Sequence, residues 1–365
     1  MFAQEADLAA RIHEAQSSGR YADAAKLYAA LIAGGEDSPP IRSNYGLMLH
    51  LSGDDAKAVE QFRIALHGEP RLEAANLFVG VSLVGLHRAT EALPYLQRAV
   101  DGDRAALAPK LALGKAYLAL RRFNEAHDIF EKLAQSDPSS AEAWYGLGIT
   151  SRSLAQEQLS VAARGESVAP AAAQALLDDA RKALGRAIDL DPDSVEAHLI
   201  LAESLSESGK LVDAVPEYRN VIRLSPGMSA GYLGLATAYW KTGAFDDARA
   251  PLLHALELSP RDPEANAMFA DILIRDNDYA GARKRAAIAV AGNPELASTR
   301  VVLARIALHD KRPRTAVEQL RKVAKADPDG SYHFLLWRAY MLLGQDAQAA
   351  EALAEYKRLR AATSR

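Results

Sequence analysis

The side chains that could do chemistry are scattered along this chain rather than grouped. Nine histidines occur, but no two stand four residues apart and no His-Glu-x-x-His pattern is present. That spacing is what places two imidazoles on one helical face for zinc. Cysteine is absent, which excludes disulfides, thiol nucleophiles and cysteine-ligated metals. The sequence therefore predicts no metal centre and no cofactor.

Two further enzyme patterns are missing. Gly114-Lys115 lacks the preceding glycine and the following Ser or Thr of a phosphate-binding loop, and no Gly-x-Ser-x-Gly nucleophile elbow occurs. Carboxylates are abundant, but nothing in their spacing selects a pair for acid–base work. We therefore expect no catalytic residue and no enzymatic activity.

The charge balance gives no reason to expect nucleic acid as a partner, since 43 basic residues stand against 47 acidic ones and the net charge is −4. No run of about 18 apolar residues occurs, so no membrane span is expected. The first residues, Met1 to Glu5, show neither a basic nor an apolar signal region. A cysteine-free chain of this kind fits the cytosol, or the periplasm if a signal peptide has been removed.

Prolines recur along the chain at a fixed interval. Pro192, Pro226, Pro260, Pro294 and Pro328 are 34 residues apart, and Pro70 and Pro138 are separated by two such intervals. Only the step from Pro138 to Pro192 is irregular, with 20 extra residues. A constant period of this size indicates an array of small repeated structures rather than a conventional globular domain.

Each repeat has the pattern of two amphipathic helices. From Leu107 to Ser140, apolar residues recur every three to four positions in two blocks, and Arg121-Arg122 separates the blocks. Because the residue before proline is driven out of the helical region, the second helix must end near Pro138. Gly53, Gly209 and Gly243 occupy one position between the blocks, where a left-handed cap favours glycine.

Small residues also recur once per repeat, which predicts close packing of the two helices. One row contains Gly46, Gly80, Gly114 and Gly148. A second row, on the second helix, contains Ala58, Ala92, Ala126, Ala180, Ala214, Ala248, Ala282 and Ala316. A third row of bulky residues contains Phe62, Leu96, Phe130, Leu184, Tyr218, Leu252 and Leu320. We expect the bulky side chains to fill the space left by the small ones.

Trp144-x-x-Leu147-Gly148, Leu113-Gly114-x-x-Tyr117, Ala126-x-x-x-Phe130 and Pro138 resemble the 34-residue pattern of the tetratricopeptide repeat. The resemblance extends over nearly the whole chain and implies an all-α, right-handed superhelical solenoid of antiparallel helix pairs. About ten repeats begin near residues 5, 39, 73, 107, 141, 195, 229, 263, 297 and 330. We expect residues 1–365 to form a single solenoid.

The extra residues, 155–174, fall between the helices of the fifth repeat. Ala155–Arg164 favours a helix, Gly165–Val168 a turn, and Pro170 the start of another helix. We expect both helices to be lengthened into an arm, with Leu154, Leu159 and Ala162 facing Ala172, Ala173 and Leu176. The arm is either a contact surface for a partner or a second copy, or a neutral surface insertion.

In tetratricopeptide repeat proteins, the first helices line a concave groove that binds peptides. The resemblance implies that the second, fifth, ninth and twelfth residues of each repeat face this groove. At these positions the candidate binding residues are Leu77, Val81, Leu111, Lys115, Tyr145, Ile149, Arg152, Glu203, Trp240, Asp271 and Arg305. Their character changes from apolar, through an acidic middle with Glu142, Glu196, Glu203 and Glu264, to a mixed end with Phe334, Arg338 and Met341.

Two interpretations of these groove residues stay open. Tyr145 and Trp240 either anchor a ligand, as aromatic residues do at binding hot spots, or pack against the next helix. The acidic middle either attracts a basic segment or is a solvated surface. The family's carboxylate clamp is not expected, because only Asn44 matches it while Ser43 and Leu47 replace its other residues.

The predicted function is that of a non-catalytic scaffold that binds a protein or peptide segment in the groove. The alternative is a self-associating structural subunit that uses the arm or the terminal repeats. Intrinsic catalysis is disfavoured because the repeats and the insertion account for nearly all 365 residues.

Overall fold

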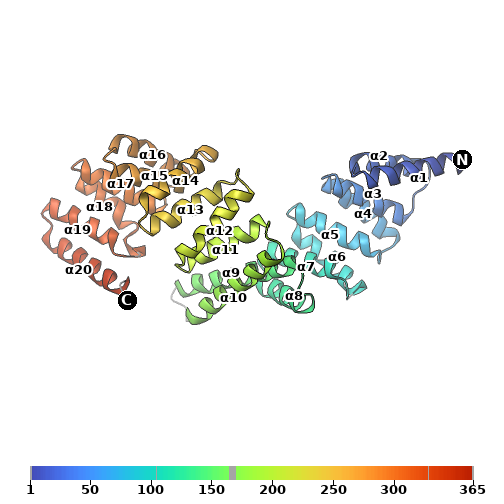
Figure 1. Ribbon diagram of the computed structural model, residues 1–365, viewed down its shortest axis with the longest axis horizontal. Coiled ribbons are helices and arrows are strands. Elements are labelled where there is room, and N and C mark those ends of the chain that lie inside the picture. The colour runs from blue at the N-terminus through green and yellow to red at the C-terminus, as the bar shows by residue number, and fades with distance from the viewer. Residues whose placement is uncertain (1, 104, 164–169, 328, 364–365) are drawn as a thin grey trace. The chain divides into compact units, whose positions relative to one another are not determined.

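The computed structural model describes residues 2–103, 105–163, 170–327 and 329–363. These residues form 20 α-helices and one 3-10 helix, with no strand among them (Figure 1). The predicted all-α fold of paired helices is confirmed. In the same residues, no helix is both long enough and apolar enough to cross a membrane.

The chain forms two compact units, residues 1–204 and 205–365, and helix α11 contains the boundary. The helices of unit 1 are α1 (Phe2–Ser17), α2 (Tyr21–Ala33), α3 (Pro39–Leu51), α4 (Asp55–Gly68), α5 (Glu73–Gly85), α6 (Ala89–Gly102), α7 (Leu107–Ala119), α8 (Phe123–Ser136), α9 (Ala141–Ala163), α10 (Pro170–Leu190) and the first part of α11 (Val195–Glu207).

Unit 2 continues the same alternation of first and second helices. Its helices are α12 (Leu211–Leu224), α13 (Ser229–Lys241), α14 (Phe245–Leu258), α15 (Pro263–Arg275), α16 (Tyr279–Gly292), α17 (Ala297–His309), α18 (Pro313–Arg321), η1 (Ala324–Ala326), α19 (Ser331–Leu343) and α20 (Asp346–Thr363). The odd-numbered helices are the first helices of their repeats, and neighbours among them also touch: α3, α5, α7 and α9 in unit 1, and α15, α17 and α19 in unit 2.

Small and bulky residues meet inside the helix pairs as the rows predict. A Cβ atom placed on Gly46 would lie 2.8 Å from the Phe62 ring, and one on Gly148 would lie 2.5 Å from Cγ of Leu184. All eight alanines of the second row have no exposed surface. The glycines therefore hold the two helices of a repeat close together, and this close approach outweighs the low helix propensity of glycine.

The turn between the paired helices uses a left-handed residue at one recurring position. Gly53, Gly209 and Gly243 have φ angles of 86°, 73° and 83° there, as predicted. Other repeats place non-glycine residues at the same position with φ between 56° and 63°: His87, Arg121, Asn277 and Lys311. These four positions carry backbone strain, because a Cβ atom disfavours the left-handed region by about 1–2 kcal/mol.

The recurring prolines are held by the fourth residue of the following first helix. The side chains of Asn76, Trp144, His198 and Asn266 each donate a hydrogen bond of 3.0 Å to the carbonyl of the proline six residues earlier. Three kinds of side chain thus satisfy the equivalent proline carbonyl in four repeats. Water would otherwise have to solvate that carbonyl in a tight inter-repeat turn. Trp144, part of the family pattern, has a structural role in this hydrogen bond.

The fifth helix pair is the longest, with 23 residues in α9 and 21 in α10, against 13 in most first helices and 14 in most second helices. The contact we predicted along it is wrong in part. Leu159 is 46% exposed and Ala172 is also exposed, whereas Ala155, Ala173 and Leu177 are buried. The less exposed side of α9 passes from Ala155 to Gln158, whose Oε1 is buried, rather than to Leu159. The predicted turn at 165–168 lies outside the described residues, as does the side chain of Ala162.

The end of unit 2 departs from the regular repeat. Helix α18 ends at Arg321, and η1 follows before α19 begins. The buried side chain of Asp327 accepts hydrogen bonds from the backbone N–H of Gly330 and of His333, each at 2.9 Å, and from Nδ1 of His333 at 2.7 Å. Asp327 therefore caps the start of α19, where the repeat is one residue shorter.

Candidate functional site

The candidate binding residues at the beginning of the predicted groove are only partly exposed. Leu77 and Val81 of α5 pack against the core of unit 1, and Leu111 of α7 packs against a neighbouring cluster around Phe130. All three side chains have intermediate exposure. This stretch of the first helices therefore presents an apolar surface that is continuous with the core.

Farther along unit 1, the charged candidates pair with one another. Lys115 of α7 forms an ion pair with Glu142 of α9. Arg152 of α9 donates to Glu203 of α11, with Nη1 and Oε2 2.9 Å apart, and the Arg152 side chain is 15% exposed. The acidic middle predicted from the sequence is thus partly neutralised by bases on the adjacent first helix, and these pairs connect successive repeats.

Tyr145 lies beside these ion pairs, with Ile149 one turn farther along α9; both have intermediate exposure. Burial, followed by the negative charges of Glu196 and Glu203, raises the pKa of the Tyr145 phenol. Glu196 is exposed and makes no ion pair with any residue that the structure describes. The face of unit 1 thus carries an apolar stretch, two ion pairs and one solvated carboxylate around an aromatic ring.

In unit 2, one buried carboxylate serves two guanidinium groups. The Asp271 side chain on α15 is 8% exposed. It pairs with Arg305 of α17 and with Arg275 one turn along α15, where Nε lies 3.3 Å from Oδ2. Burial lowers the pKa of Arg305, and the nearby positive charge of Arg338 lowers it further. Such a buried pair costs free energy to separate, because either partner alone would be left desolvated.

Arg338 of α19, which the sequence placed in the mixed end of the predicted groove, stands at the ninth position of its repeat, as Asp271 and Arg305 do in theirs. It is exposed, and it makes no ion pair within the described residues. Arg275 was not predicted from the sequence. Its spacing of four residues from Asp271 on one helix, which allows the two side chains to interact, could have indicated it.

Trp240 of α13 has intermediate exposure and packs against a core cluster that includes Leu252 and Met268. Its ring meets Phe245 edge-on with 6.3 Å between centroids, and the Arg275 guanidinium stacks 3.6 Å from the centre of the Phe245 ring. The buried Trp240 Nε1 has no hydrogen-bond partner among the described residues. The indole is therefore part of the packing between α13 and α15, next to the arginine and aspartate cluster.

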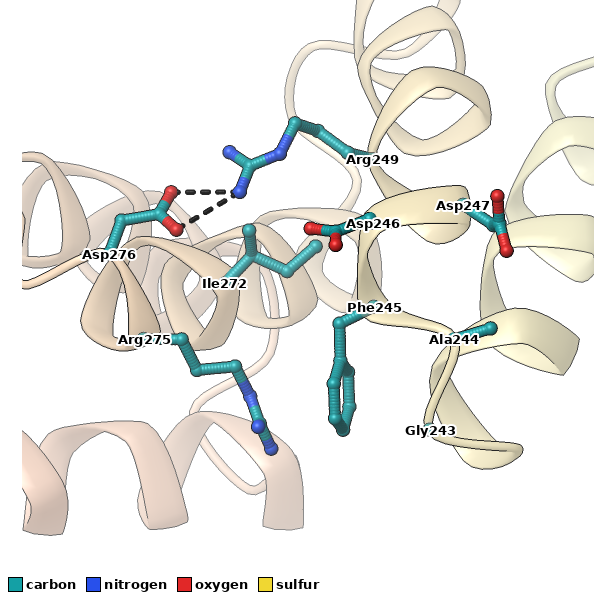
Figure 2. A pocket seen from close by; sticks show the side chains of 9 residues that line it. All are labelled: Gly243, Ala244, Phe245, Asp246, Asp247, Arg249, Ile272, Arg275 and Asp276. Atoms are coloured by element: carbon teal, nitrogen blue, oxygen red, sulfur yellow. Dashed lines mark hydrogen bonds and ion pairs between the residues drawn. The ribbon is translucent and has the colours of Figure 1, made fainter.

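A hollow of about 350 Å³ lies beside this cluster. Figure 2 shows the residues that line it, Gly243 to Asp247, Arg249, Ile272, Arg275 and Asp276. Phe245 and Arg275 project to the same side of it, and Arg249 pairs with Asp276 at 2.9 Å (Figure 2). Similar hollows occur at residues 19–23 with 51–52 and at 87–91 with 119–120. Each lies where one repeat's turn meets the end of the next first helix, so it is a product of repeat geometry rather than a dedicated site.

One serine, histidine and aspartate cluster in unit 1 lacks the geometry of a nucleophile. Asp55 Oδ1 and Ser82 Oγ lie 2.6 and 3.0 Å from the same ring nitrogen, Nδ1 of His50. A catalytic triad needs the serine and the carboxylate on opposite nitrogens of the imidazole. The cluster instead ties α3, α4 and α5 together. Within the described residues, no group of three or more His, Asp or Glu side chains could hold a metal ion.

Sequence comparisons identify the repeats. One tetratricopeptide repeat model matches residues 83–148 and 205–272, and a second matches 10–76, 171–229 and 267–331. Among curated proteins, DnaJ homolog subfamily C member 3 of Rattus norvegicus is 22% identical over 336 residues, covering 84% of this chain and 64% of that protein. Anaphase-promoting complex subunit 3 of Schizosaccharomyces pombe is 26% identical over 293 residues, covering 74% and 43%. The chain therefore spans less than two thirds of the length of these relatives.

Among solved structures, the APC/C hetero-tetramer Cut9-Hcn1 matches with a TM-score of 0.53 and 15% identity, covering 96% of this chain and 72% of the matched one. At this identity the likeness concerns the fold alone. Proteins built from these repeats are generally protein-interaction scaffolds. With repeat matches spread from residue 10 to residue 331 and paired helices throughout both units, this chain belongs to the tetratricopeptide repeat family.

Proposed function

We propose that this protein is a non-catalytic scaffold and that the first-helix face of each compact unit binds a protein or peptide segment. The observation that carries the proposal is the row of ninth residues, one per repeat. In unit 1 the row contains His13, Leu47, Val81, Lys115, Ile149 and Glu203, and in unit 2 it contains Thr237, Asp271, Arg305 and Arg338. Chemical character varies along the row, while the helix-packing rows stay uniform.

This contrast between rows supports binding rather than folding as the role of the face. The buried alanines and their bulky partners repeat because each repeat must pack in the same way. The ninth residues include apolar, basic, acidic and hydroxyl side chains, a variety that packing alone does not require. A segment lying across several repeats would contact these side chains one after another. Extended ligands gain specificity in this way when their alternate side chains enter successive pockets.

The test is selection of 12-residue peptides from a random displayed library on the wild-type protein. The selected peptides are then measured against Val81→Arg, which adds a bulky charge to the face of unit 1, and Thr237→Arg, which does so in unit 2. The matched control is Val212→Arg, because Val212 is 75% exposed on α12, a second helix. We expect each peptide to bind at least about tenfold more weakly to one of the face variants and unchanged to the control.

Equal binding to all three variants would contradict the proposal, as would failure of the library to yield any peptide. Circular dichroism melts of the three variants establish that each is folded. The alternative function, self-association through the long α9–α10 pair, is favoured by the 46% exposure of Leu159. Light scattering tests it: a mass that stays monomeric as concentration rises contradicts self-association, and a dimer lost in Leu159→Glu supports it.

A further inference from the structure

The first helices of unit 2 carry a marked excess of positive charge. Helices α13, α15, α17 and α19 contain five basic residues, Lys241, Arg275, Arg300, Arg305 and Arg338, against two acidic ones, Glu264 and Asp271. Helices α17 and α19 have no acidic residue at all. The excess therefore increases toward the last two repeats.

Few of these positive charges are neutralised on the face itself. Asp271 is shared by Arg275 and Arg305, so one carboxylate stands between two guanidinium groups. Arg300 is satisfied elsewhere, by Glu295 at 2.6 Å. Arg338 is exposed, has no ion-pair partner in the described residues, and lies close enough to Arg305 to influence its ionisation. Two neighbouring arginines on adjacent helices are thus left with an incomplete set of carboxylates.

Exposed apolar side chains surround Arg338 on α19. Met341 is 52% exposed and Leu342 is 63% exposed. They stand three and four residues after Arg338, so all three occupy one side of the helix. Phe334, one turn before Arg338, packs on Trp337 and on Tyr356 with ring centroids 5.2 and 5.3 Å apart. A free guanidinium is therefore bordered by apolar surface that no described residue covers.

We infer that this surface, formed by Arg305, Arg338, Met341 and Leu342, binds an acidic segment of a partner protein that also carries apolar side chains. Carboxylates of the segment complete the charge balance of Arg305 and Arg338. Arg338 can grip one carboxylate in a bidentate manner, which a lysine cannot do. Met341 and Leu342 take the apolar side chains, and methionine adapts its shape to different ligands. The inference rests on the proposed function and names the class of segment for unit 2.

Charge complementarity favours an acidic segment as the ligand of this surface. A basic segment would meet Arg305 and Arg338 with like charge, and such repulsion weakens binding. The alternative ligand is a second copy of the chain, because the chain itself has exposed apolar side chains. If a second copy bound this surface, the molar mass measured by light scattering would rise with protein concentration, and Arg338→Ala would abolish the rise.

The experiment measures fluorescence anisotropy with a labelled peptide of six Asp-Leu repeats. Reference peptides replace every Asp with Asn or with Lys. The variants are Arg338→Ala, Arg338→Lys and, as matched control, Arg314→Ala, because Arg314 is exposed on the second helix α18 and makes no ion pair with a described residue. Arg305 is left intact, since its removal would strand the buried Asp271.

We expect the Asp-Leu peptide to bind the wild-type protein at least about tenfold more tightly than the Asn-Leu peptide, and the Lys-Leu peptide not to bind. Arg338→Ala should weaken binding about tenfold, Arg338→Lys should restore part of it, and Arg314→Ala should leave it unchanged. Raising the salt concentration should weaken binding to the wild type more than to Arg338→Ala.

Equal affinity for the Asp and Asn peptides would overturn the inference, as would an equal loss in Arg338→Ala and Arg314→Ala. A concentration-dependent dimer that Arg338→Ala abolishes would also overturn it, by assigning the surface to a second copy. If library peptides bind and are lost in Thr237→Arg while the acidic peptide does not bind, the proposed function stands and the acidic class is wrong. If no peptide of any kind binds, both are wrong.

Discussion

Arg152 and Glu203 form an ion pair between α9 and α11, with 2.9 Å between Nη1 and Oε2. Both residues stand at positions that the resemblance to other repeat proteins assigns to the groove, and we expected both to contact a ligand. Their pairing means that the first-helix face is pre-organised by its own charges. A ligand at this point either forms further hydrogen bonds to the intact pair or replaces Arg152 or Glu203 as the partner of the other. Replacement leaves the number of ion pairs unchanged.

This ion pair should contribute measurably to stability because the Arg152 side chain is only 15% exposed. In a double-mutant cycle with Arg152→Ala and Glu203→Ala, we expect a coupling free energy of about 1 kcal/mol. The matched pair is Arg63 and Glu91, which also joins successive repeats but has side chains 42% and 45% exposed. Its coupling should stay below about 0.5 kcal/mol. Equal coupling in both cycles would show that burial does not strengthen the first pair.

The buried carboxylate of Asp271 should be much more important for folding than a surface carboxylate of the same helix region. Asp271→Asn removes the charge that compensates Arg305 and should lower the free energy of unfolding by about 3 kcal/mol. Asp276→Asn breaks the exposed pair with Arg249, whose side chains are 37% and 43% exposed, and should cost less than about 1 kcal/mol. Urea titration of both variants checks the difference, and a cost of the same size in each would contradict it.

Glycine at position 148 should be irreplaceable, whereas glycine at 185 should not. Gly148→Leu forces the α9–α10 pair apart, because even a Cβ atom would lie 2.5 Å from Leu184 Cγ; we expect a loss of about 1–3 kcal/mol. Gly185 of α10 has open space where its Cβ would lie. Gly185→Leu should therefore stabilise the helix by about 0.5–1 kcal/mol through propensity. Thermal unfolding of both variants measures these changes. An unchanged stability of Gly148→Leu would contradict the close approach of α9 and α10 at this position.

The left-handed turn residues predict a stabilising substitution. Lys311 has a φ angle of 59°, and Lys311→Gly should raise the free energy of unfolding by about 0.5–1 kcal/mol as the strain of its Cβ is removed. Lys311→Ala keeps the Cβ and removes the rest of the side chain, so it should have no such effect. Stabilisation by alanine as large as that by glycine would assign the effect to the charge instead.

Stability at high pH should depend on Tyr145. Burial, and then the charges of Glu196 and Glu203, raise its folded-state pKa above the ordinary value for tyrosine, about 10. The folded protein therefore holds the phenolic proton more tightly than the unfolded chain, and the associated stability falls as pH rises above about 10. Tyr145→Phe should lose less stability than the wild type between about pH 9 and pH 11. Identical pH dependence of the melting temperature would contradict the raised pKa.

Glu196→Gln offers a partial version of the same test. Because burial is the larger cause of the raised pKa, removal of one negative charge should shift the ultraviolet titration of Tyr145 toward lower pH without restoring an ordinary value. A titration unchanged by Glu196→Gln would assign the whole shift to burial and Glu203.

The helix pairs and their packing rows followed from the sequence because they depend only on local periodicity. Gly148 and Leu184 meet through contacts within one repeat, and every repeat solves the same packing problem. The pairing of Arg152 with Glu203 could not be predicted in that way, because it depends on the rotation between successive repeats. Small differences in that rotation decide which of several nearby charges come within hydrogen-bond distance.

Other errors have equally specific causes. Leu159 was expected to face α10, but the buried side of α9 passes through Gln158, a phase shift that hydrophobicity alone does not reveal. The hydrogen bond from Asn76 to the Pro70 carbonyl was overlooked even though its signal, a donor six residues after the proline, is visible in the sequence. That donor changes from asparagine to tryptophan to histidine, so its common role is hidden when identity alone is compared.

Site-specific photo-crosslinking tests the central claim, ligand binding by the first helices, most directly. A benzophenone side chain is placed at Val81, at Thr237 or at Val212, and each protein is irradiated with a peptide selected from the library. We predict crosslinks from position 81 or position 237, on first helices, and none from position 212, whose side chain is the most exposed of the three. Crosslinks that form only at position 212 would place the ligand on the second helices and contradict the account.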